Sequence, residues 1–224
     1  MRPARSFMKI LTLDAALARC SVALWQSGTV LAGRTVEAGR GHAALLPVLV
    51  AEVFAAAGHS ADGLDAVAVT VGPGSFTGLR AAVSLAQGLA AGAGASLVGV
   101  TVAEAMADAV PPCGRAVWVA IDSRRDRVFL SRDGVVAAFA VDALPPTGGP
   151  VVVVGDAAVA VACRLAARGD NVMLGDGRVP DIGRVAAVAA RRLAGALAEV
   201  PVRPLYIDPP EAKLPAGGLR PAPR

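Results

Sequence analysis

The segment that most constrains the fold is a strand, a glycine-rich turn and a helix of small residues in direct succession. Residues 69–90 read VTVGPGSFTGLRAAVSLAQGLA. Residues 64–71 predict an apolar strand, and Gly72-Pro73-Gly74 predicts a turn, since glycine adopts backbone angles that other residues resist. Ser75 or Thr77 is suited to cap a helix that continues to about residue 91. A strand that turns directly into a helix is typical of α/β folds.

This turn has two interpretations. Its free amides and the positive end of the helix dipole could hold a nucleotide or another anion, with Asp14, Gly72, Gly74 and Ser75 as the candidate contacts. Alternatively, the glycines only permit a tight turn before a helix that packs closely. The segment is not a P-loop, because no Gly-Lys-Ser/Thr follows it.

Composition favours a cytoplasmic protein without a membrane span. The 224 residues allow one large domain or two lobes, and 54% of them are hydrophobic. No apolar run has the length and aliphatic content of a membrane helix. The basic stretch 1–7 lacks the apolar core of a signal peptide, and Met8 is an alternative start. Cys20, Cys113 and Cys163 are isolated, which predicts free and mostly buried thiols in a reducing compartment.

Charge and histidine positions limit the chemistry. The net charge of +4 permits weak contact with nucleic acid. The one local basic cluster, Arg124, Arg125 and Arg127, reads either as a solvated hairpin or as an RNA contact. His42 and His59 are too far apart to form a helical metal-binding pair. A zinc peptidase is therefore unsupported for lack of ligands.

The order of predicted elements indicates two similar halves. Strands at 9–13, 21–25 and 29–36 form an antiparallel meander, followed by a helix at 40–58 with Pro47 in its first turn, the strand and helix described above, and a strand at 96–100. The second half holds a helix from Thr101 with a capping box to Glu104, strands at 116–121, 128–132, 135–141 and 151–154, and helices at 157–168 and 183–197. We expect an N-terminal lobe at 1–100, a C-terminal lobe at 101–200 and a proline-rich tail at 201–224.

Five segments resemble, in this order, the TsaB (YeaZ) family: ILTLDAALARCSVAL, RGHAALLPVLVAEVFAAAG, VTVGPGSFTGLRAAVSLAQGLA, AIDSRRDRVFL and PLYIDPPEAKLP. The resemblance implies an α/β, two-lobed, actin-like (ASKHA, ribonuclease H-like) fold with mixed sheets and flanking helices. It also implies a non-catalytic subunit, a pseudoenzyme, of the bacterial machinery that adds threonylcarbamoyl to adenosine beside the anticodon of tRNA.

The resemblance further implies which partners the chain has. A TsaD-like catalytic paralogue forms a heterodimer with this subunit, a TsaE-like ATPase joins them, and tRNA is reached indirectly through the complex. ATP and a divalent metal are expected only in the complex, and a weak homodimer is expected without the partner. Stand-alone ATPase or phosphotransferase activity is the alternative function, because the fold can host it.

The resemblance assigns partner binding to the first two helices, although the second lobe could instead cover them. The expected partner-binding residues are His42, Leu45, Leu46, Leu49, Val50, Val53, Thr77, Leu79, Arg80, Ala82, Val83, Leu85 and Ala86. Leu45, Leu49 and Val53 are expected to face the sheet, and Leu46 and Ala82 to point outward. Arg80 reads equally as an interface or anion contact and as a solvated side chain.

Two departures from the family pattern and one difference from the catalytic paralogue bear on chemistry. The family's Asp-Thr-Ser is here Asp14-Ala15-Ala16, so two hydroxyl donors to phosphate are missing. Asp14 is then either a polar residue of the interlobe cleft or the cap of its own turn. The paralogue's metal-binding His-x-x-x-His is absent, since Leu46 stands four residues after His42. The tail has Tyr206-Ile207-Asp208 where Tyr-Leu-Arg is common.

One further turn carries charged residues. Asp122 and Asp126 flank the arginines between two predicted strands. A catalytic carboxylate there would need a base, nucleophile or metal partner that the sequence does not show. Local ion pairs on a solvated turn are the alternative.

Overall fold

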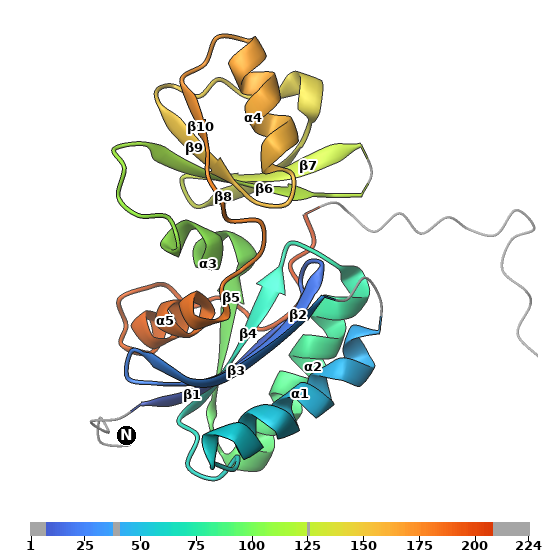
Figure 1. The fold of residues 1–224 in the computed structure, drawn as a ribbon, viewed down its shortest axis with the longest axis vertical. Helices are drawn as coiled ribbons and strands as arrows, with labels where there is room; N and C mark the ends of the chain where they lie inside the picture. Colours follow the sequence, from blue (N-terminus) through green and yellow to red (C-terminus); the bar gives the residue numbers. More distant parts are fainter. Residues whose placement is uncertain (1–7, 38–40, 125, 208–224) are drawn as a thin grey trace, which may run out of the picture.

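The computed structural model describes residues 8–37, 41–124 and 126–207, and within them two five-stranded sheets stand one above the other (Figure 1). The first sheet comprises β1 (Lys9–Asp14), β2 (Arg19–Gln26), β3 (Thr29–Glu37), β4 (Ala66–Gly72) and β5 (Ser96–Thr101) in the order β3-β2-β1-β4-β5. The second comprises β6 (Ala116–Asp122), β7 (Arg127–Arg132), β8 (Val135–Ala140), β9 (Val151–Val154) and β10 (Val172–Leu174) in the order β10-β9-β6-β7-β8. The predicted two-lobed α/β architecture with mixed sheets is confirmed.

The two sheets share one topology. In the first sheet, β1 pairs antiparallel with β2 and parallel with β4, and β2 and β4 pair in turn with β3 and β5. In the second, β6 pairs antiparallel with β7 and parallel with β9, which pair in turn with β8 and β10. The strands β6, β7, β8, β9 and β10 of the second sheet thus correspond in position to β1, β2, β3, β4 and β5 of the first. The similarity of the two halves in sequence pattern reflects this repeated topology.

Helices cover both faces of the first sheet. α1 (His42–Ala57) and α2 (Phe76–Ala93) pack on one face, and α5 (Ile182–Leu193) packs on the other (Figure 1). Every residue of β4, AVAVTVG, is consequently buried. This matches the rule that parallel strands covered on both faces read as unbroken apolar runs.

Two helices connect the two halves. α3 (Val102–Asp108) lies between the sheets, because its Val102 and Met106 share one buried cluster with Leu17 and Leu79 of the first half and with Val119 and Ile121 of the second sheet. α5 follows β10 but packs on the first sheet, although the sequence places it within the expected C-terminal lobe. α4 (Ala158–Ala167) packs on the opposite face of the second sheet, near the 3-10 turn 141–143. α3 and α5 thus tie the two halves together.

Several local predictions are confirmed. Ser75 caps α2 by accepting a hydrogen bond from the Gly78 amide, and Thr101 and Glu104 form the expected capping box of α3. The predicted strands at 128–132 and 135–141 correspond to β7 and β8, and the two residues between them, Asp133 and Gly134, have the positive φ that a type I′ hairpin turn requires.

Two local predictions are wrong. α1 begins at His42, so Pro47 lies in its second turn rather than its first. Cys20 is buried, but Cys113 and Cys163 are exposed free thiols, because one follows the Pro-Pro segment after α3 and the other lies on the solvent side of α4. The tail residue Asp208 and the basic stretch 1–7 lie outside the described residues.

Candidate interaction site

The glycine turn joins β4 to α2 against the turn that follows β1. A Cβ atom on Gly74 would overlap the carbonyl oxygen of Ala16, and one on Gly78 would overlap the carbonyl oxygen of Ala15. The Ser75 amide donates to the Ala16 carbonyl at 2.6 Å. The glycines therefore allow two turns to touch backbone to backbone, which is the close-packing interpretation of this segment.

The turn's own polar groups have partners within the chain. Ser75 Oγ accepts from the Gly78 amide at 3.2 Å, and the Leu79 amide donates to the Ser75 carbonyl at 2.9 Å. Gly72 has φ of 115°, and a Cβ there would press on Leu79 and on the carbonyl of Leu205. These contacts give the turn a structural role. The predicted anion contact at Gly72, Gly74 and Ser75 stays a prediction.

Asp14, at the end of β1, is a buried carboxyl group with local partners. Its Oδ1 accepts the Thr70 hydroxyl at 2.5 Å and the Ala16 amide at 3.1 Å, so it caps its own turn. Burial raises the pKa of Asp14 to about 6, against the lowering effect of these two hydrogen bonds. Burial, and then the Asp14 charge, also raise the pKa of the nearby Cys20 thiol to about 11.

The second lobe repeats this arrangement in weaker form. Asp122 ends β6 as Asp14 ends β1, and its Oδ1 accepts the Arg124 amide two residues on, at 2.8 Å. Asp156 accepts the Asp122 amide at 2.8 Å, and burial raises the pKa of Asp156. Arg124 also pairs with Asp122 at 3.7 Å. The charged turn is thus held by local polar contacts; Arg125 lies outside the described residues.

The described residues contain no group of three or more histidine, cysteine, aspartate or glutamate side chains placed to hold a metal ion. Nor is any helix in the described ranges long and apolar enough to cross a bilayer.

The expected outward direction of Leu46 and Ala82 is wrong. Leu46 is 1% exposed and Ala82 is fully buried, in the core between α1, α2 and the first sheet. The other buried members of the expected partner-binding set are His42, Leu49, Val50, Val53, Leu79, Val83 and Ala86, whereas Leu45 and Leu85 are half-buried and Thr77 and Arg80 are exposed. Because α1 is apolar on nearly every side, periodicity could not select which stripe faces the sheet.

The helix faces turned away from the sheet are also apolar or small. We call them the outer face: Ala44, Val48, Ala51 and Ala55 of α1, and Ser84, Gly88 and Ala91 of α2, all exposed. Val48 is 54% exposed, and nothing lies within 4 Å of a Cβ placed on Gly88. Small residues at a spacing of three to four let another helix approach closely. The alternative that the second lobe covers these helices is not what the structure shows, since that lobe lies beyond the ends of the strands (Figure 1).

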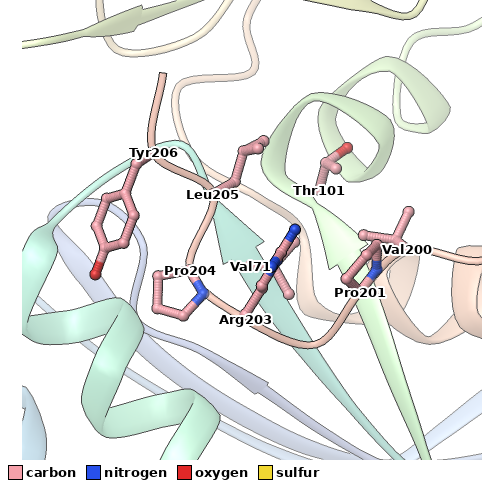
Figure 2. A pocket seen from close by; sticks show the side chains of 8 residues that line it. All are labelled: Val71, Thr101, Val200, Pro201, Arg203, Pro204, Leu205 and Tyr206. Atoms are coloured by element: carbon pink, nitrogen blue, oxygen red, sulfur yellow. The ribbon is translucent and has the colours of Figure 1, made fainter. Parts of the chain in front are cut away.

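Residues 198–207 run from the end of α5 back across the first sheet to α2. The Leu205 amide donates to the Val71 carbonyl at 2.7 Å, and the Ala198 carbonyl accepts from Arg192 Nε at 2.6 Å. This strap borders an open pocket of about 460 Å³ lined by Val71, Thr101, Val200, Pro201, Arg203, Pro204, Leu205 and Tyr206 (Figure 2).

Arg80 is the centre of an exposed cluster where the strap meets α2. Its guanidinium lies 3.7 Å from the centroid of the Phe76 ring, and its Nε donates to the Tyr206 hydroxyl at 2.9 Å. The Phe76 and Tyr206 rings are 5.9 Å apart. Arg80 is thus exposed yet held in place. Sequence reasoning singled out Arg80 but missed Phe76 and Arg203, because an isolated aromatic or basic residue gives no periodic signal.

Comparison with known proteins identifies related sequences and structures. Residues 36–164, more than half of the chain, match the family model described as TsaD: tRNA N6-adenosine threonylcarbamoyltransferase. The chain is 39% identical over 124 residues to the tRNA threonylcarbamoyladenosine biosynthesis protein TsaB of Escherichia coli (strain K12), a match that covers 54% of this chain and 53% of that protein. The chain therefore spans about half the length of this curated relative.

Two further similarities agree with this match. A tRNA N6-adenosine threonylcarbamoyltransferase of Paracoccus denitrificans (strain Pd 1222) is 51% identical over 63 residues, covering 28% of this chain and 18% of the enzyme. A Pseudomonas aeruginosa structure, described as an uncharacterized protein with similarity to peptidase YEAZ, superposes with a TM-score of 0.72 at 25% identity, covering 90% of this chain and 100% of that one. The resemblance to the TsaB (YeaZ) family is confirmed.

Proposed function

Since the chain belongs to the TsaD family of tRNA N6-adenosine threonylcarbamoyltransferases, we propose that it serves threonylcarbamoyladenosine biosynthesis as a non-catalytic partner subunit. It pairs with a TsaD-like catalytic paralogue, and a TsaE-like ATPase joins the pair. The match to a protein named TsaB covers 54% of this chain and the match to the transferase covers 28%, which supports this role.

The outer face is the observation that carries the proposal. Two neighbouring helices expose Val48, Ala51, Ser84 and Gly88 to solvent although their opposite sides already fill the core. A helix that packs on one sheet needs a single apolar stripe, so a second stripe of alanine, valine and glycine indicates a further packing partner. The same face supports weak self-association without the paralogue, because a second copy presents the identical surface.

The alternative, a stand-alone ATPase or phosphotransferase, has less support from the geometry. Phosphoryl transfer needs a carboxylate that can reach a metal or a nucleophile. Asp14 is 1% exposed, and its Oδ1 is engaged by Thr70 and Ala16. ATP and a divalent metal belong, in our proposal, to the assembled complex.

The pairing is tested by co-expressing the chain with the TsaD-like paralogue of the same genome and sizing the product. Val48→Glu should lower the affinity for the paralogue by three or more orders of magnitude. Burying an unpaired charge costs several kcal/mol, and each ~1.4 kcal/mol changes the dissociation constant about tenfold. Gly88→Leu should also weaken it by blocking close helix approach.

Val159→Glu is the matched control. Val159 is 50% exposed on α4 of the other lobe, close to the 54% of Val48, so the same substitution there should leave pairing intact. All three variants should melt near the wild-type temperature. Normal pairing of both outer-face variants, or loss of pairing with Val159→Glu, would show that the partner binds elsewhere.

A further inference from the structure

Two arginines near the strap lack an acidic partner. Among the described residues, no carboxylate lies within ion-pair distance of Arg80 or Arg203. The Arg203 side chain makes no hydrogen bond among the described residues, and Arg80 donates one, from its Nε to the Tyr206 hydroxyl. Both terminal nitrogens of the Arg80 guanidinium thus remain available, in the planar arrangement that suits phosphate oxygens.

Aromatic rings lie beside these cations. Phe76 is 56% exposed and Tyr206, the only tyrosine of the chain, is 49% exposed. One face of the Phe76 ring is covered by Arg80. Exposed rings next to arginines are the chemistry by which single-stranded nucleic acid is held, since bases stack on aromatic or guanidinium planes while arginines pair with phosphates.

Two open pockets flank the cluster of Phe76, Arg80 and Tyr206. The pocket of about 460 Å³ has Tyr206 at one end and Thr101 at the other, with Arg203 between them (Figure 2). A second pocket of about 380 Å³ is bordered by Arg80, Gln87, Arg203 and Tyr206 among others. Both volumes fall within the range of roughly 300–1,000 Å³ found for small-molecule sites. Both pockets are open to solvent and lie beside the exposed rings and arginines.

We propose that Phe76, Arg80, Arg203 and Tyr206 form a contact site for single-stranded RNA, with bases on the rings and phosphates on the arginines. This site goes beyond the pairing role, because it gives the chain a direct contact with RNA. RNA fits the exposed cluster better than a protein does, since unpaired arginines beside exposed rings suit phosphates and bases, whereas the core of a stable protein interface is depleted of charged residues.

The test measures fluorescence anisotropy of a labelled single-stranded RNA of about 12 nucleotides, a length that such surfaces cover, with the isolated full chain. We expect a Kd on the order of 10 to 100 µM near physiological salt. R80A/R203A should weaken binding. It should also reduce the magnitude of the salt slope, d log K/d log[salt] with K the association constant, by about 1.4, because each phosphate contact on a single strand contributes about 0.7. F76L/Y206L should weaken binding about tenfold or more.

The control is R34A/R164A, which removes two exposed arginines that already have partners, Arg34 with Glu52 and Arg164 with the Asp142 carbonyl, and should leave the slope nearly unchanged. Because Arg203 is exposed and its side chain makes no hydrogen bond or ion pair among the described residues, Arg203→Ala alone should keep the fold and reduce the magnitude of the slope by about 0.7. No binding by the wild type, or equal loss in the cluster and control variants, would overturn the proposal. So would a cluster variant that binds RNA normally but no longer pairs with the paralogue, which would make the cluster a protein contact. The RNA assay contains no paralogue, so its failure is distinct from failure of the pairing proposal.

Discussion

At the scale of single residues, the chain uses polar groups of its family pattern for structure. Asp14 ends β1 where actin-like folds place a phosphate-contacting loop, but here Oδ1 is bound by Thr70 and Ala16 within a closed core. From sequence, Asp14 could be either a polar residue of the interlobe cleft or the cap of its own turn. The hydrogen bond from Thr70 could not be predicted, because Thr70 lies on another strand and comes beside Asp14 only in the folded chain.

The buried Asp14 predicts a pH dependence of stability. Its folded pKa of about 6 exceeds the ordinary 3.8, so the folded chain holds this proton to higher pH than the unfolded chain. The stability contributed by the protonated group is complete below pH 4 and is lost as pH rises through about 6. Asp14→Asn, which cannot ionise, should gain up to about 3 kcal/mol in unfolding free energy relative to wild type between pH 4 and pH 7.

Urea denaturation at both pH values measures this difference. Asp170→Asn serves as a control that should show almost no change between these two pH values, because Arg168 lowers the pKa of Asp170 and its stabilisation is lost only as pH falls below about 4. A constant difference between Asp14→Asn and wild type at all pH values would contradict the buried-carboxyl account.

At the scale of elements, strands and helices were predictable from pattern, whereas helix orientation was not. The apolar run of β4 and the caps of α2 and α3 are local signals that sequence shows directly. β10 was missed because three residues are too few for a periodic signal. Leu46 was misplaced because α1 carries apolar residues on both its core side and its outer face.

The glycines of α2 predict opposite effects of one substitution. Gly78→Ala should destabilise the chain by at least about 2 kcal/mol, because its Cβ would overlap the Ala15 carbonyl oxygen. Gly88→Ala should stabilise it by about 0.5–1 kcal/mol, because alanine suits a helix interior and the site is open. Thermal melting of the two variants makes the comparison, and equal effects would refute the close contact between the two turns.

At the scale of the whole molecule, α3 and α5 join two lobes of the same topology. Buried Arg192 on α5 donates to the Gly99 carbonyl at 2.6 Å and to Glu104 of α3 at 2.5 Å. Sequence predicted both helices but not where they pack, because periodicity shows that a helix has an apolar face and not which sheet covers it. Likewise, the resemblance pointed to α1 and α2 for partner binding, and only their burial identified the outer face.

Arg192 should therefore matter far more than its neighbour on the same helix. Arg192→Ala leaves Glu104 and two carbonyl groups without their partner and should cost about 3–5 kcal/mol. Arg191 pairs with Asp108 at the surface, so Arg191→Ala should cost about 1 kcal/mol or less. Chemical denaturation of both variants tests this, and similar losses would argue against Arg192 as the link between the helices.

The central claim is tested most directly by the threonylcarbamoyladenosine content of tRNA, measured by mass spectrometry of digested tRNA from cells depleted of this chain. The account predicts that the modified nucleoside falls on depletion and returns with wild type or with Val159→Glu. It should stay low with Val48→Glu, although that variant changes no polar group of the chain and folds normally. Unchanged modification in depleted cells, or full rescue by Val48→Glu, would contradict the account.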